Sequence, residues 1–105
     1  MTIIPKWFES LIESNLLMKY VFKVSQEYLR RPRSMQFRAG EKTKSGRWKN
    51  LHYAVYTKRN LRYDVRSKDR EFTCTCDFFK NKGFCSHILA VSQITGTWPK
   101  MKDVA

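Results

Sequence analysis

The chain has 105 residues and a formal net charge of +12, from 21 basic and 9 acidic side chains. This length suits one small domain whose single core is adequate but not large. With 42% hydrophobic and 14% aromatic residues, the composition excludes a disordered tail. The positive charge favours a polyanionic partner, either nucleic acid or an acidic protein surface, although many small soluble proteins are simply basic.

Residues 1–31 predict one long helix, or two helices in line. Apolar side chains recur there at helical spacing: Ile4, Trp7, Phe8, Leu11 and Ile12, then Leu17, Tyr20, Val21, Val24 and Tyr28. The apolar stripe shifts near Ser14-Asn15, which indicates a bend or a change of packing partner, and Pro32 ends the segment. Charged residues interrupt every apolar run that could cross a bilayer, and no signal-peptide pattern is present. We therefore expect a cytoplasmic protein.

This helical segment has more apolar surface than a small sheet can easily cover. Two interpretations follow. The segment packs on the sheet as part of the core, or its excess face, comprising Trp7, Leu11 and Phe22, binds a partner. A homodimer and a heteromeric complex would both fit the second interpretation.

The middle of the chain is strongly basic. Between Tyr28 and Tyr63 there are eleven basic residues and one acidic residue, Glu41. Such concentration favours a surface that contacts phosphates, and the alternative is a solvated loop and hairpin tip. The predicted nucleic-acid contacts are Arg33, Arg38, Lys44, Arg47, Lys58, Arg59 and Arg62. A short strand over 34–39 and a flexible turn over 40–46 are expected in this region.

Two alternating segments, 51–56 and 61–65, predict a β-hairpin with its turn at 57–60. Leu51, Tyr53 and Val55 share one face of the first strand, and the other face includes His52 and Tyr56. Basic and aromatic groups on an outward face could hold phosphates and stack on bases. Alternatively, Tyr56 only covers a neighbouring strand. His52 is interpreted as a strand residue and not as a metal ligand.

All three cysteines and the second histidine lie in Cys74-Thr75-Cys76 and Cys85-Ser86-His87. The pattern predicts one tetrahedral zinc site. A strand over 70–75 would direct Cys74 and Cys76 to the same side, because alternate strand residues share a face. A helix over about 87–95 would follow, with Cys85 in the turn that opens it and His87 in its first turn. The helix N-terminus favours thiolates there.

Other interpretations of these four residues are weaker. Three cysteines cannot form a full set of disulfides. A nucleophilic pair of Cys85 and His87 would lack a third orienting group and would leave two cysteines unused. We therefore expect a closed structural Zn²⁺ site, with Phe78, Phe79 and Phe84 packed around the metal and a loose tail over 100–105.

These motifs resemble the SWIM zinc finger, whose signature is C-x-C followed by C-x-H. The resemblance includes the stretch from Phe72 to Phe78 and the stretch from Cys85 to Val91, and it covers roughly residues 50–95. Asp77 departs from the proline that is frequent in the family, and Ser86 departs from the frequent lysine. Neither residue is a metal ligand. Stand-alone SWIM proteins act as accessory partners of RecA-family recombinase paralogues in homologous-recombination repair, so the resemblance implies such a partner.

The expected fold is a small α+β domain: an N-terminal helix, an antiparallel sheet of three or four strands, and a zinc-bound C-terminal helix. Residues 1–31 would pack on a SWIM-type domain over 32–105 to give one globular unit. No glycine-rich phosphate loop, paired carboxylates or nucleophile triad is present, so neither an enzyme nor a small-molecule substrate is expected. The expected function is binding of nucleic acid, DNA rather than RNA, or of a protein partner in DNA recombination or repair. The alternative is a DNA-binding regulator of viral or plasmid type without a recombinase partner.

Overall fold

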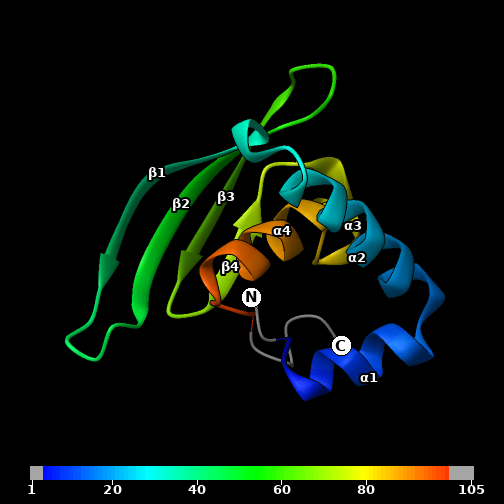
Figure 1. Ribbon diagram of the computed structural model, residues 1–105, viewed down its shortest axis with the longest axis horizontal. Coiled ribbons are helices and arrows are strands. Elements are labelled where there is room, and N and C mark those ends of the chain that lie inside the picture. The colour runs from blue at the N-terminus through cyan, green and yellow to red at the C-terminus, as the bar shows by residue number, and fades with distance from the viewer. Residues whose placement is uncertain (1–3, 100–105) are drawn as a thin grey trace.

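The computed structural model describes residues 4–99, so the first three residues of the predicted N-terminal helix and the predicted loose tail lie outside it. The α+β class is confirmed: Figure 1 shows the helices gathered on one side of a four-stranded antiparallel sheet. Along the chain the elements are α1 (Lys6–Ser14), α2 (Leu16–Leu29), the 3-10 helix η1 (Pro32–Ser34), β1 (Met35–Lys42), β2 (Trp48–Tyr56), β3 (Arg62–Lys68), β4 (Glu71–Cys74), α3 (Asp77–Lys82) and α4 (Ser86–Thr95). Within this part of the chain, none of the helices combines the length and apolarity needed to span a membrane.

The N-terminal segment forms two helices that meet at Asn15. The backbone of Asn15 is extended, and its side-chain oxygen accepts a hydrogen bond from the Met18 amide at 3.1 Å, which caps the start of α2. Figure 1 shows α1 and α2 at an angle to each other. The predicted bend near Ser14-Asn15 is therefore confirmed, and the in-line arrangement is wrong because the cap residue turns the chain.

The four strands follow one another in the sheet in the order β1-β2-β3-β4. Their register aligns Met35 with Val55, Val55 with Tyr63, and Val65 with Cys74. Alternation then turns these residues to the helical side of the sheet. There they join Ile88 and Val91 of α4 in one core cluster. A second cluster lies between the helices and contains Phe8, Met18, Val21, Phe84, Leu89 and Trp98.

Two parts of the sheet and finger differ from expectation. β1 extends to Lys42, beyond the short strand expected over 34–39, with register shifts after Phe37 and after Glu41. The spacer between the two ligand pairs contains the helix α3. Asp77 in its first turn and lysines in its last turn match the helix dipole, and Gly83 ends it in the left-handed conformation, with φ of 80°. These charges and the glycine are visible in the sequence, so the helix α3 could have been predicted from it.

Candidate metal centre

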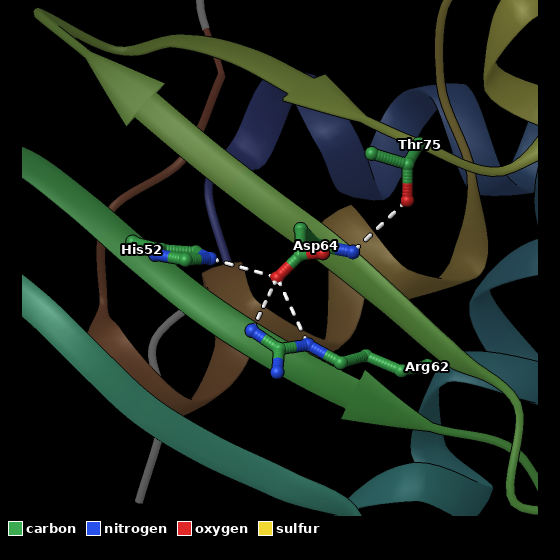
Figure 2. Close-up of polar contacts among 4 residues, drawn as sticks. All are labelled: His52, Arg62, Asp64 and Thr75. Carbon is green, nitrogen blue, oxygen red and sulfur yellow. Dashed lines mark hydrogen bonds and ion pairs between the residues drawn. The ribbon is translucent and has the colours of Figure 1, made fainter.

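The first two candidate ligands lie where β4 continues past its last regular residue. The Thr75 amide donates to the Asp64 carbonyl at 3.2 Å. The Asp64 amide donates to Thr75 Oγ1 at 3.0 Å, as Figure 2 shows. The ladder between β3 and β4 thus extends through Thr75. Because side chains alternate along an extended chain, Thr75 is exposed while Cys74 and Cys76 are buried on the other side.

The other two ligands lie at the start of α4, as the sequence predicted. Cys85 is the residue before the first helical turn and has an extended backbone, and His87 lies within that turn. All four side chains are buried, and the three sulfurs and a ring nitrogen of His87 lie within 4.8 Å of one another. Four donors, from the chain at the end of β4 and from the chain at the start of α4, therefore converge on one point.

The donor set fits zinc in both chemistry and spacing. Zinc binds thiolate sulfur at about 2.3 Å and imidazole nitrogen at about 2.0–2.1 Å, so a tetrahedral site separates sulfur from nitrogen by roughly 3.6 Å. The distance from Cys74 Sγ to His87 Nδ1 is 3.7 Å. Only a small contraction of the cluster would bring all four donors to bonding distance, and four protein ligands would close the site.

Residues 65–96 match the family model of the SWIM zinc finger. The matched segment begins within β3, ends at the glycine that follows α4, and contains all four candidate ligands. Comparison of the chain with curated proteins and with solved structures gave no match. The chain therefore contains a SWIM zinc finger whose Cys74, Cys76, Cys85 and His87 are positioned to bind Zn²⁺.

Outside the SWIM finger, α2 supplies a contact to the histidine ligand. The Tyr28 hydroxyl lies 3.1 Å from His87 Nε2, while His87 Nδ1 faces Cys74. An imidazole whose Nε2 donates its proton to Tyr28 keeps the Nδ1 lone pair free for a metal. The Tyr63 ring lies 4.8 Å from the His87 ring, centroid to centroid, and covers it from β3.

Hydrogen bonds among the three thiols shift their pKa values in different directions. Cys74 stabilises the thiolate of Cys76, and this lowers the pKa of Cys76. The same bond raises the pKa of Cys74 to about 12, and hydrogen bonding to Cys74 together with burial raises the pKa of Cys85. The thiolate of Cys76 thus disfavours ionisation of the other two cysteines. A divalent cation bound among the sulfurs would lower the pKa of all three thiols, because its own charge is the largest in the site.

The predicted nucleic-acid residues are exposed, but they do not form one cluster. Lys44 and Arg47 lie in the turn between β1 and β2, at one end of the sheet. Lys58 and Arg59 lie in the turn between β2 and β3, at the other end, where Arg33 of η1 is also found. Arg38 lies on the edge strand β1.

Arg62 differs from the other predicted contacts because it has an acidic partner. Its Nε and Nη2 donate to Asp64 Oδ1 at 3.2 and 3.0 Å, and His52 Nε2 donates to the same oxygen at 2.8 Å (Figure 2). His52 is therefore a half-buried strand residue that pairs with Asp64, and it is not among the metal-ligating cluster of the described residues.

The predicted partner residues Trp7, Leu11 and Phe22 are partly buried, and they pack against the second core cluster. The large exposed apolar side chains of the N-terminal helices are instead Leu16, Leu17 and Tyr20, at the start of α2. Their exposure is not visible in the sequence, because they continue the same apolar periodicity as the buried residues.

Proposed function

We propose that the chain is a nucleic-acid-binding module in which zinc fixes α4 to the sheet and the sheet contacts phosphates. The observation that supports this proposal most directly is the distribution of charge, which is strongly positive in the sheet and balanced in the N-terminal helices. Residues 35–68, which form β1–β3 and their turns, include ten basic and two acidic residues. Residues 6–29 of the two N-terminal helices include three of each.

The geometry of the sheet supports the same role. Its face opposite the helices is not covered by any described element (Figure 1). That face includes the exposed Arg66 and the half-buried Tyr56. Asp64, one of the two acidic residues of this region, is paired with His52 and Arg62, so its charge opposes phosphate binding only weakly. Four protein ligands leave zinc no open position, which favours binding over catalysis.

The test measures affinity for single-stranded and duplex DNA and for RNA over a range of salt concentrations. Each phosphate neutralised contributes roughly 0.7–0.9 to the slope of log affinity against log salt. Replacing both Lys58 and Arg59 by serine should therefore lower the slope by about 1.4–1.8. Replacing Lys19 and Lys23 of α2 by serine makes the same change of charge on the helical layer and should have little effect. Negligible binding at low salt, or equal effects of the two double variants, would refute the proposal.

A second candidate function, that of an adaptor for a protein partner, is favoured by the exposed apolar surface of α2. Leu16 is 85% exposed and Tyr20 is 64% exposed, which is costly for large apolar side chains without a partner. By resemblance to stand-alone SWIM proteins, the partner would be a RecA-family recombinase paralogue in the cytoplasm, where reducing conditions keep thiols free for metal. Purification of the native complex tests this role, and recovery of no recombinase or repair ATPase would count against it.

A further inference from the structure

A hollow of about 450 Å³ lies between the end of the β1–β2 hairpin and the end of α4. Small-molecule sites in proteins commonly have volumes of about 300–1,000 Å³. The chain has three tryptophans, and all of them, Trp7, Trp48 and Trp98, line this hollow. We call it the tryptophan pocket. Indole rings at its wall provide flat surfaces on which another aromatic ring can stack.

Trp48 reaches this side of the sheet because of an irregularity in the strand pairing. Simple alternation would place Trp48 on the same face as Asn50 and His52. The register shifts between Glu41 and Lys42, so that Lys42 is opposite Trp48 while Glu41 is opposite Asn50. The extra residue turns Trp48 over Gly40, where a Cβ atom would lie only 2.7 Å from the indole ring. Phe37 flanks the same ring at 5.7 Å between centroids.

Cationic side chains surround the tryptophans. Lys42 Nζ lies 4.8 Å from the centroid of the Trp48 ring, and Arg47 lies in the adjoining turn. Arg70 donates to the Trp98 carbonyl at 2.9 Å, and this bond fixes the end of the helical layer against the sheet. No aspartate or glutamate is among the described residues that line the pocket. The pocket therefore favours a ligand that is both anionic and aromatic.

We propose that the tryptophan pocket binds one unpaired nucleotide of a single-stranded nucleic acid. The base stacks on Trp48 in place of the Lys42 ammonium, and Lys42 together with Arg47 then holds the adjoining phosphate. A base within a duplex is covered on both faces by its neighbours and cannot stack on a protein ring, so the pocket selects single strands. This inference rests on the proposed nucleic-acid binding and adds to it a site and a preference for single strands. DNA and RNA share the chemistry that the pocket would recognise.

Tryptophan fluorescence tests the proposal directly, because every tryptophan of the chain lines the pocket. The zinc-loaded protein is titrated with a short oligothymidylate, with the corresponding oligouridylate, and with a blunt-ended DNA duplex of the same length. Stacking of an unpaired base should quench the emission at saturation with one or both single strands. The duplex should bind with much less quenching. This comparison uses the unaltered chain and does not depend on the folding of any variant.

Substitution of Trp48 provides the second measurement, by anisotropy of a labelled single strand. Trp48→Leu should weaken binding by about 5- to 150-fold, the range for loss of one stacked base, without changing the salt slope. Trp48→Phe should retain most of the affinity because it keeps an aromatic face. Tyr20→Ala removes an exposed aromatic ring from α2, outside the pocket, and should have no effect.

The outcomes distinguish a failure of the pocket proposal from a failure of the proposed nucleic-acid binding. Equal quenching by single strand and duplex, or an unchanged affinity of a folded Trp48→Leu variant, would overturn the pocket while salt-dependent binding to the sheet could persist. Absence of binding to every nucleic acid at low salt would overturn both. Selective quenching by single strands with loss of affinity in Trp48→Leu but not in Tyr20→Ala is the result that we expect.

Discussion

The Tyr28 hydroxyl of α2 lies 3.1 Å from Nε2 of His87, whereas Nδ1 of the same ring faces Cys74 Sγ at 3.7 Å. The two residues are 59 positions apart in the chain. The contact connects the N-terminal helices to the metal centre, because the proton that Nε2 shares with Tyr28 decides whether Nδ1 is free to bind zinc. The zinc site is thus built by the SWIM finger and oriented by a helix outside it.

Tyr28→Phe should lower the affinity for Zn²⁺ while preserving the fold. The ring remains to fill the core, and only the hydrogen bond to His87 is lost. Loss of such a contact to a metal-bound histidine typically reduces metal affinity by about 10–100-fold. Competition with a chromophoric chelator measures the affinity. Tyr20→Phe removes an exposed hydroxyl from the same helix and serves as the control. Equal affinities of the two variants would show that Tyr28 does not orient His87.

Removal of the metal should unfold the chain and not only impair one activity. Structural zinc contributes roughly 10–16 kcal/mol of apparent binding free energy, as much as the whole stability of a typical small domain. Cys74→Ser and His87→Ala should therefore both lose the native circular dichroism and the cooperative melting transition. Ser86→Ala changes a residue between two ligands without removing a donor, and it should remain folded. A chelator-treated chain that keeps its native spectrum and melting temperature would contradict a structural role for the metal.

The zinc ligands were predictable from the sequence because their geometry is local. Alternation along a strand places Cys74 and Cys76 on one side, and the start of a helix places Cys85 and His87 near each other. The pairing of Leu51–Tyr56 with the following strand was predictable for the same reason, since a period of two residues is visible within a short window.

The remaining features depend on contacts between distant segments or on irregular backbone. Nothing near Tyr28 in the sequence distinguishes it from the other apolar residues of the helix, so its contact with His87 could not be foreseen. The side of the sheet on which Trp48 lies is set by one register shift in β1–β2, and alternation alone predicts the opposite side. Likewise, helical periodicity could not separate the exposed Leu16 from the buried Met18 without knowledge of where α4 packs.

Asp64→Asn should destabilise the protein by about 1 kcal/mol, because the hydrogen-bonded pairs on this face are partly exposed and therefore modest in strength. The Asp64 side chain is 24% exposed, and that of its partner Arg62 is 42% exposed. Urea unfolding of the zinc-loaded protein near neutral pH measures the difference. Asp69→Asn provides the control, since it removes the same charge from an exposed turn whose left-handed backbone asparagine also adopts.

The pH dependence of this difference has a definite sign. The hydrogen bond from His52, with a further contribution from Arg62, lowers the pKa of Asp64 from its ordinary value of 3.8. A lowered pKa in the folded state gives stability that is present above the unfolded value and is lost only as the pH falls through the folded value. From pH 8 to pH 5 the difference between wild type and Asp64→Asn should therefore not shrink. Convergence of the two proteins above pH 5 would refute the assignment.

Gly40→Ala should displace the Trp48 ring. A Cβ atom at position 40 would lie 2.7 Å from the indole and 3.1 Å from the Asn50 carbonyl oxygen, so the ring must move. Overpacking of this kind costs about 1–3 kcal/mol. Gly46→Ala is the matched control. Its added methyl group meets nothing within 4 Å, but its φ of +87° is strained for alanine, so it should cost about 1–3 kcal/mol through the backbone alone. Both variants should lose stability, and only Gly40→Ala should change the emission maximum and the acrylamide quenching of tryptophan. Identical spectra for the two variants would show that Gly40 does not determine the position of Trp48.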